Sequence, residues 1–207
     1  MEKKYCAITF DDGPNEFTVP ITDKFIEYGG KASFMVMGDR INDQTEKYLK
    51  YAIDKGFLLA SHSQTHAHLE FLSYDEAKNE LTAPVKELKK RFNYSTCYAR
   101  VPYIIYSNKS LKAAKDAGLI LCGTDIDGGA DWDPNVTPEH IAKHVLSYFA
   151  DGAIACLHVT KNTLKALDII LPELKNRGFV FLTVDELLKV KNKKAPFGIN
   201  IDNVNDL

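Results

Sequence analysis

The sequence predicts an α/β fold, a distorted barrel of the (β/α)7 type with its functional site at the C-terminal ends of the strands. Short apolar, β-branched runs alternate with longer segments of helical periodicity, which is typical of repeated βαβ units around a parallel sheet. Polar and ionisable residues follow directly after the apolar runs, as they do at the active edge of such folds. An open, doubly wound sheet is the less favoured alternative.

The expected strands are short apolar runs spaced along most of the chain. They lie at residues 4–10, 32–37, 58–61, 96–101, 119–123, 153–158 and 180–182. The expected helices lie between and after them, at residues 18–28, 44–55, 74–91, 108–117, 138–150, 163–177 and 184–190. No linker or low-complexity segment interrupts this alternation.

Several helix starts carry their own signals. Ser73 and Thr183 are each followed three residues later by Glu, the pattern of a capping box in which each side chain satisfies the backbone donor of the other residue. Thr137 precedes Pro138, and proline is well tolerated at the first helical position because its missing N–H would have no partner there. These residues fix the expected starts of three helices.

The strand and helix alternation ends near residue 190. We therefore expect residues 1–190 to form one domain and residues 191–207, which lack periodicity and contain Pro and Gly, to form an irregular C-terminal extension. A chain of 207 residues is long enough to bury a sizeable core without disulfides or a structural metal. We expect the protein to be a monomer.

The charge balance limits the classes of partner. With 26 Lys and Arg against 28 Asp and Glu, the chain has no excess of positive charge for a nucleic-acid backbone. No apolar run approaches the roughly 18 residues that a membrane span needs. The apolar residues 5–10 are too few for a signal peptide. We expect an extracellular or cell-surface protein if a targeting segment has been removed, and a cytoplasmic protein otherwise.

Polar residues that could carry chemistry follow five of the predicted strands. Because the carboxyl ends of parallel strands meet at one edge of the sheet, we expect these side chains to lie close together. The candidates are Asp11, Asp12, His62, His66, Arg100, Tyr103, Asp127, Asp131, Trp132 and His158.

His62 and His66 are four residues apart, so on one helical turn their rings would share a face. Two imidazoles and one carboxylate form a metal site that leaves coordination positions open for water and substrate. His140 and His144 have the same spacing but lie inside a predicted helix, where we interpret them as an ordinary helix face.

Five motifs carry a resemblance to a known family. They are TFDDGP at 9–14, HSQTH at 62–66, RVPY at 100–103, ADW at 130–132 and the lone His158 after an apolar strand. In this order they resemble the motifs of the polysaccharide deacetylases, carbohydrate esterase family 4, also called the NodB-homology domain. The resemblance extends from about residue 4 to residue 190. It implies metal-dependent removal of acetyl groups from an acetylated polysaccharide or oligosaccharide.

The resemblance also implies roles for individual residues. Asp12 would bind one divalent metal ion together with His62 and His66, and Asp11 would be the catalytic base. A metal in such a site lowers the pKa of a water ligand from 15.7 towards roughly 7. Arg100 would pair with Asp11 and orient it, a use suited to the rigid guanidinium fork.

The resemblance assigns the remaining roles to residues around the leaving group and the acetyl group. His158 would protonate the departing sugar oxygen or nitrogen, and Asp131 would pair with His158. The backbone N–H of Tyr103 would stabilise the oxyanion, and the side chain of Trp132 would form a wall of the acetyl pocket.

The sequence departs from the family pattern in three places. Val101 stands where the family usually has proline. Three residues separate Asp127 from Asp131, where the family often has two between its aspartates, so Asp127 is the alternative partner of His158. The family usually has aspartate after the last histidine, where this chain has Val159.

The motifs do not separate the substrates of the family. The segments 65–69 and 158–164 resemble loops of some acetylxylan esterases, which slightly favours acetylxylan over peptidoglycan or chitin-type N-acetylglucosamine polymers. The donor set suits Zn, Co, Ni or Fe, and we expect Zn. The alternatives from other classes are a catalytically inactive carbohydrate-binding domain and a glycosidase with paired carboxylates.

Overall fold

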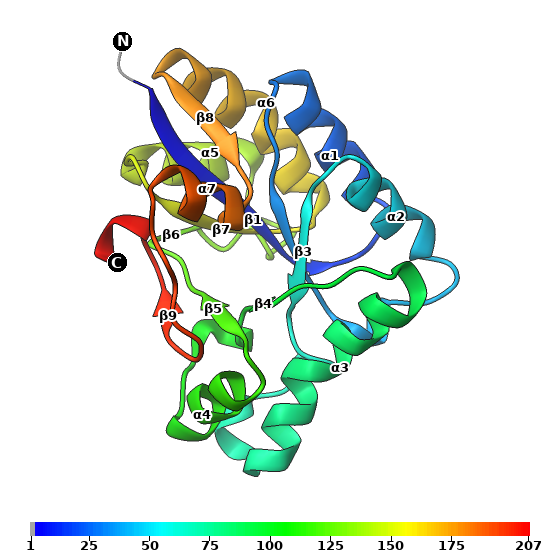
Figure 1. The fold of residues 1–207 in the computed structure, drawn as a ribbon. Coiled ribbons are helices and arrows are strands. Elements are labelled where there is room, and N and C mark those ends of the chain that lie inside the picture. The colour runs from blue at the N-terminus through cyan, green and yellow to red at the C-terminus, as the bar shows by residue number, and fades with distance from the viewer. Residues whose placement is uncertain (1–2) are drawn as a thin grey trace.

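A parallel sheet curled into a half-barrel forms the centre of the computed structural model, which describes residues 3–207 (Figure 1). Nine strands are formed by the described residues. They are β1 (Lys4–Gly13), β2 (Ser33–Val36), β3 (Leu58–Ser61), β4 (Tyr98–Ala99), β5 (Ile120–Cys122), β6 (Ile126–Asp127), β7 (Ile154–His158), β8 (Phe179–Leu182) and β9 (Asn200–Ile201). Their order is β6-β7-β1-β2-β3-β4-β5-β9, and β8 pairs with β1. The predicted β/α barrel class is confirmed.

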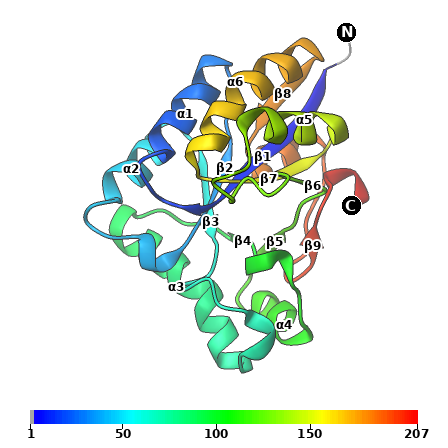
Figure 2. The same ribbon diagram turned by 180° about the vertical axis from the view of Figure 1, so that it is seen from behind.

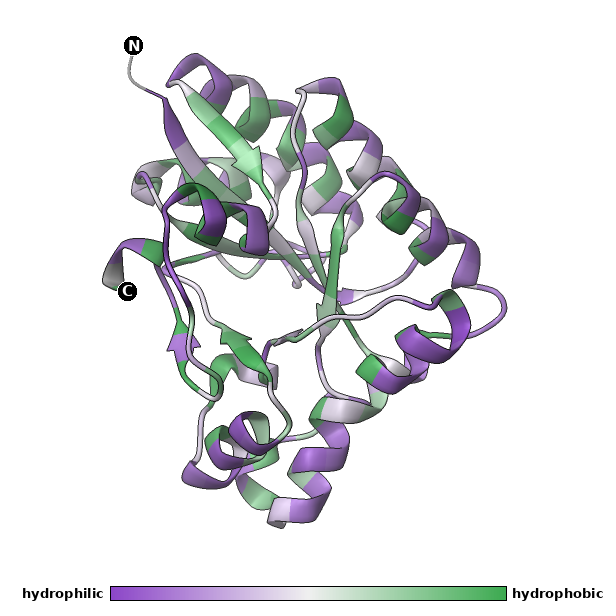
Figure 3. Ribbon diagram, viewed as in Figure 1, coloured by the Kyte–Doolittle hydropathy of each residue, from purple (hydrophilic) through white to green (hydrophobic). Residues whose placement is uncertain are grey.

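Helices follow most of the strands. They are α1 (Thr18–Glu27), α2 (Glu46–Asp54), α3 (Tyr74–Phe92), α4 (Asn108–Asp116), α5 (Pro138–Tyr148), α6 (Lys161–Asn176) and α7 (Val184–Val190). Short 3-10 helices are η1 (Gly38–Arg40), η2 (Leu69–Phe71), η3 (Pro102–Ile104) and η4 (Val204–Asp206). Seen from behind, α1, α5 and α6 lie together over one side of the sheet (Figure 2). Their ribbons alternate between hydrophobic and hydrophilic residues (Figure 3), as expected of helices with one buried face.

Alternate residues of the central strands pack into two different clusters. Ile8 and Phe34 belong to a large cluster that includes buried residues of α1, α5 and α6. Their neighbours Ala7 and Met35 belong to a second cluster, which includes Leu187 of α7. Because successive side chains of a strand point to opposite faces, both faces of the sheet are covered.

The predicted helix starts agree with the structure. Ser73 and Thr183 each form the expected capping box at the start of α3 and α7. The Thr137 side chain caps α5, in which Pro138 is the first residue. Among residues 3–207, no helix is long and apolar enough to cross a membrane.

The segment after Lys191, which we expected to be irregular, adds a strand to the sheet. β9 pairs in parallel with β5, and Asn203 forms an antiparallel bridge with Ala153, just before β7. Ile201 and Val204 are buried. The segment therefore connects the β5 edge of the sheet with β7, and its red ribbon in Figure 1 lies beside β5. A two-residue strand is too short to show periodicity in the sequence.

Candidate active site

A cavity of about 530 Å³ opens at the carboxyl ends of β1, β3 and β7. Most of the sequence-predicted site residues line it. The lining residues are Asp11, Asp12, His62, His66, Tyr103, Ile104, Asp127, Gly128, Ala130, Asp131, Trp132, Cys156 and His158.

Asp12, His62 and His66 converge on one point of this cavity. The Asp12 Oδ1 atom lies 3.5 Å from His62 Nε2 and 3.4 Å from His66 Nε2. Among the described residues, these three form the one group of His, Cys, Asp or Glu side chains whose ligand atoms lie close enough to share a metal ion. The rings of His62 and His66 meet edge to face, with centroids 4.9 Å apart.

The chemistry of this group fits a divalent cation. Asp12 Oδ1 is buried and has no hydrogen-bond partner, which is costly for a carboxylate oxygen unless a cation compensates it. Ligand atoms bound tetrahedrally to a zinc-sized ion at ordinary distances lie about 3.3 Å from one another. The observed Asp12 to histidine separations of 3.4 and 3.5 Å are close to that value.

The two histidines do not lie on a helical turn, so the expected reason for their convergence is wrong. His62 follows β3 directly, and His66 lies in a loop at a φ of 61°. The loop turns back because Ser63 also has a left-handed φ of 63° and its Oγ accepts a hydrogen bond from the His66 backbone N–H at 2.9 Å. Asp12 has a φ of 64°. Strained backbone of this kind gathers at functional sites.

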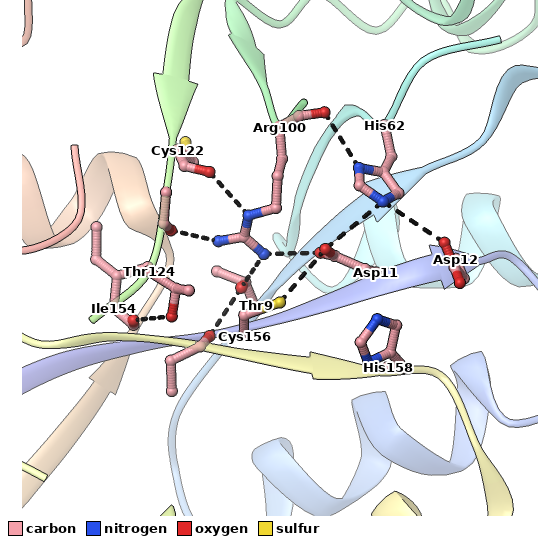
Figure 4. A network of polar contacts seen from close by, with 12 residues as sticks. Thr9, Asp11, Asp12, His62, Arg100, Cys122, Thr124, Ile154, Cys156 and His158 are labelled. Atoms are coloured by element: carbon pink, nitrogen blue, oxygen red, sulfur yellow. Dashed lines mark hydrogen bonds and ion pairs between the residues drawn. The ribbon is translucent and has the colours of Figure 1, made fainter. Parts of the chain in front are cut away.

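The orientation of His62 is fixed by the backbone of the neighbouring strand. Its Nδ1 lies 3.1 Å from the Arg100 carbonyl oxygen, which can only accept, so Nδ1 carries the proton and Nε2 keeps its lone pair facing Asp12 (Figure 4). Burial lowers the pKa of His62 below 6.5, more than Asp11 and Asp12 raise it. A neutral imidazole is the form that binds metal.

Asp11 is held by a buried arginine. Arg100 Nη1 donates to Asp11 Oδ1 at 2.7 Å and to Thr9 Oγ1 at 2.6 Å. Its other two nitrogens donate to the carbonyl oxygens of Cys122 and Gly123 at 2.8 and 2.6 Å (Figure 4). Burial would raise the pKa of Asp11, but Arg100, His62 and His158 together outweigh burial and lower the pKa below 3.8. Asp11 is therefore ionised, with Oδ2 facing the metal group.

His158 pairs with Asp131 rather than with Asp127. Asp131 Oδ1 lies 2.7 Å from His158 Nδ1, and Asp131 Oδ2 accepts from the His158 backbone N–H and from Thr163 Oγ1, both at 2.7 Å. Burial opposes the charged imidazolium, but Asp131, with Asp11 and Asp12, outweighs burial and raises the pKa of His158 to about 9. Because Nδ1 is engaged with Asp131, Nε2 is left for the cavity.

Asp127 has a different environment. Its exposed carboxylate accepts from the Gly129 backbone N–H at 2.7 Å and lies 3.1 Å from His144 Nε2. His140 and His144 lie on α5, as expected, with ring centroids 6.5 Å apart. Asp127, which the sequence left open as a partner of His158, therefore contacts His144 of α5 instead.

Tyr103 and Trp132 line the cavity and are both exposed, by 51% and 64%. Tyr103 and Ile104 have left-handed φ angles of 59° and 57°, which turn the chain sharply after β4. Trp132 follows directly after Asp131, whose side chain is buried.

Sequence reasoning missed Cys156 and Thr163. Cys156 lines the cavity, and its Sγ donates to Asp11 Oδ2 at 3.3 Å. Burial, and next the Asp11 carboxylate, raise the pKa of Cys156 well above 9.0, so it remains a thiol. Strand alternation could have found it, because it lies two residues before His158 and so shares its face. Nothing in the sequence indicates that Thr163 contacts Asp131.

The fold and the site together define a class of protein. It is a β/α half-barrel with an Asp-His-His group that could hold a metal ion beside an arginine-bound aspartate. The family model described as polysaccharide deacetylase matches residues 1–121. This chain belongs to the polysaccharide deacetylase family, which confirms the resemblance and the expected enzyme class.

Three similar proteins illustrate the range of the family. A peptidoglycan-N-acetylglucosamine deacetylase of Bacillus cereus is 33% identical, over 92% of this chain and 91% of its own. A bifunctional xylanase/deacetylase of Pseudobutyrivibrio xylanivorans is 29% identical over 92% of this chain, which spans only 31% of that protein. The structure of a family 4 acetyl xylan esterase from Clostridium thermocellum in complex with a cobalt ion has a TM-score of 0.90 and 30% identity, covering 97% of this chain and 99% of that one.

Proposed function

We propose that this protein is a metal-dependent hydrolase that removes acetyl groups from an acetylated carbohydrate and releases acetate. The observation that carries the proposal is the buried, unpartnered Asp12 Oδ1 atom between the two histidine Nε2 atoms, with the ionised Asp11 beside it. Asp12, His62 and His66 would hold the ion. When bound, the ion supplies Lewis acidity at the acetyl carbonyl and lowers the pKa of a water ligand.

Asp11 acts as the base. Its Oδ2 atom takes the proton of the attacking water, because Oδ1 is occupied by Arg100 and Oδ2 lies on the side of His62, 3.6 Å from its Nε2. Arg100 keeps Asp11 ionised and fixes its orientation. A positioned base contributes about 10² to 10⁴ in rate.

His158 acts as the acid. Its Nε2 donates a proton to the sugar oxygen or nitrogen as the bond between that atom and the acetyl carbon breaks. The new bond joins the acetyl carbon to the water oxygen, so the products are acetate and the free hydroxyl or amine. Asp131 stabilises the imidazolium form of His158. The Tyr103 N–H contributes to the oxyanion site, and Trp132 forms a wall for the acetyl methyl group.

Acetylxylan is the substrate that we favour, and N-acetylglucosamine polymers are the second candidate. The esterase from Clostridium thermocellum supports the first and the Bacillus cereus deacetylase supports the second. Zinc is the metal that we favour, and cobalt, nickel or iron would suit the same donors. A single chain supplies every residue of the proposed site, which is in keeping with a monomeric enzyme.

An acetate-release screen tests the proposal. The substrates are acetylated xylan, N-acetylated chitooligosaccharides and peptidoglycan, each with and without a chelator. We expect release from at least one substrate and its loss with the chelator. Metal binding without release from any substrate would instead support the inactive carbohydrate-binding alternative, and release that persists without metal would contradict the metal-dependent mechanism.

A further inference from the structure

Beside the cavity lies a row of aromatic rings for which the proposed mechanism has no use. The His68 ring stacks on the Tyr103 ring with centroids 3.9 Å apart and an interplanar angle of 6°. Phe71 lies next to His68, with ring centroids 5.8 Å apart. The row starts at Tyr103, which lines the cavity, and continues to His68 and Phe71, which are not among the lining residues.

The outer members of this row are open to solvent but held in place. Phe71 is 81% exposed, and the His68 side chain is 44% exposed. Leu69, between them in the sequence, is fully buried and anchors the segment to the core. Glu70 Oε1 lies 3.0 Å from His68 Nδ1 and restrains the orientation of the ring. Rings that are already ordered lose little conformational entropy when a ligand binds them.

We propose that Phe71 and His68 form a binding subsite for a pyranose unit next to the unit that carries the acetyl group. The inference rests on the proposed function, and it assigns the two rings to a sugar unit beyond the acetylated one. Aromatic side chains offer a large, rigid apolar face, and the apolar C–H face of a pyranose ring is its natural complement.

The position of the row beside the cavity indicates which ligand would bind to it. A sugar chain whose acetyl group enters the cavity must leave it across the rim, and Tyr103 belongs both to the cavity lining and to the stacked row. The subsite is therefore continuous with the proposed active site. Trp132, 64% exposed, lines the same cavity and belongs to the proposed acetyl pocket, so it does not take part in this inference.

The test compares binding and turnover for ligands of different length. Titration calorimetry with unacetylated xylobiose, xylotetraose, chitobiose and chitotetraose measures binding without turnover. Acetate release from 4-nitrophenyl acetate, a small ester with no sugar chain, measures the chemistry alone. We expect Phe71→Ala to weaken binding of a tetrasaccharide roughly threefold to tenfold, the size expected for one aromatic contact, and to leave hydrolysis of the small ester unchanged.

Three matched variants separate stacking on an aromatic ring from a general apolar contact and from an unspecific effect of removing an exposed ring. Phe71→Tyr keeps the ring and should retain tetrasaccharide binding, whereas Phe71→Leu keeps only apolar character and should not. Phe197→Ala removes an aromatic side chain that is 50% exposed and precedes β9, at the opposite end of the sheet from the cavity, and should have no effect.

The inference is overturned if Phe71→Ala binds tetrasaccharides as tightly as the unaltered protein, or if Phe71→Leu does. It is also overturned if Phe71→Ala changes the oligomeric state in light scattering, because the patch would then be a protein interface. If no substrate releases acetate but binding still depends on chain length, the proposed function is contradicted and the proposed subsite is not.

Discussion

Arg100 is among the largest fully buried side chains of the described residues, and its charge faces one carboxylate. A buried ion pair often adds little net stability, because desolvation offsets the attraction. We therefore expect this ion pair to serve mainly to orient the Asp11 carboxylate and keep it ionised, rather than to add net stability. Arg100 donates four hydrogen bonds, to Asp11, Thr9 and two carbonyl oxygens, so the guanidinium has little freedom to reorient.

The substitution Asp11→Asn tests the proposed base. We expect metal content to stay near that of the unaltered protein and acetate release to fall by about 10² to 10⁴, because the amide cannot accept the proton. The protein should also lose several kcal/mol of unfolding free energy, of the order of 3 to 5, since the Arg100 charge is left uncompensated. Metal analysis, acetate assay and urea unfolding measure the three effects. Full turnover in this variant would exclude Asp11 as the base.

The pairing of His158 with Asp131 predicts a pH effect. Because the pKa of His158 is raised from 6.5 to about 9 in the folded protein, its stabilising contribution is fully present below pH 6.5 and is lost as the pH rises through about 9. The acid must be protonated to act, so acetate release should fall on the alkaline side.

In Asp131→Asn we expect the alkaline limb of the rate profile to move to lower pH, towards the ordinary value of 6.5, and the maximal rate to fall. A rate profile from pH 5 to pH 10, at constant metal loading, measures the shift. Asp127→Asn is the matched control, because Asp127 contacts His144 rather than His158. If the alkaline limb of the rate profile stays in place in Asp131→Asn, or moves equally in both variants, the result would argue against His158 as the acid.

The sequence located most of these residues because they stand within short motifs at strand ends. It could not choose between Asp127 and Asp131, since both lie in one loop and only the path of the backbone decides which carboxylate reaches His158. Alternation along β7 places Cys156 on the face of His158, but its contact with Asp11 spans 145 residues and the contact of Thr163 with Asp131 spans 32, so no local pattern indicates either contact.

At the level of elements, the loop after β6 has two consecutive residues with left-handed backbone. Gly129 and Ala130 have left-handed φ angles of 61° and 63°, and these bring the Asp131 carboxylate under His158. A Cβ atom on Gly129 would lie 2.8 Å from His144 Cγ, whereas one on Gly118, whose φ is 67°, would meet nothing within 4 Å. The two glycines share a conformation and differ in their surroundings.

This difference defines a matched pair of substitutions. Gly118→Ala should cost about 1 kcal/mol of unfolding free energy, the strain of a left-handed alanine. Gly129→Ala should cost about 1 to 3 kcal/mol through the added contact with His144, and should lower acetate release because Asp131 and Trp132 move with the loop. Denaturant unfolding and acetate assays measure both. Equal stability losses with full activity in both variants would show that the loop tolerates displacement.

Elements with long periodic patterns or clear capping residues were predictable, as α3, α5 and α7 show. β6 and β9 have two residues each and form only because a neighbouring strand offers them hydrogen-bond partners. The conformation of the HSQTH loop was not predictable either. The Ser63 hydroxyl and left-handed turns replace the helix that the spacing suggested.

At the scale of the whole molecule, the C-terminal segment joins two edges of the curled sheet. Asn203 Nδ2 donates to Asp125 Oδ2, and the Thr124 N–H donates to Asp202 Oδ1 at 3.1 Å. Thr124 and Asp125 precede β6, whose loop carries Asp131. The segment therefore supports the side of the barrel from which the proposed acid is oriented, a long-range relation that the sequence pattern alone could not reveal.

Ile201→Ala tests this support. Ile201 is 2% exposed and belongs to the cluster on the α7 face of the sheet, so we expect a loss of about 2 to 5 kcal/mol of unfolding free energy. Ile199, two residues earlier, is 53% exposed, and Ile199→Ala should change stability by less than about 0.5 kcal/mol. Urea unfolding of both variants measures the difference. Equal midpoints would mean that the segment does not contribute to the core.

We propose above all that acetate release depends on an ion held by Asp12, His62 and His66. The most direct measurement is acetate release from the substrate found by the screen, before and after removal of metal, with metal content determined in the same samples. We predict that activity disappears with the metal and returns with one equivalent of zinc or cobalt, and that His66→Ala neither retains the ion nor recovers activity. Undiminished acetate release from metal-free protein, or from His66→Ala, would contradict the claim.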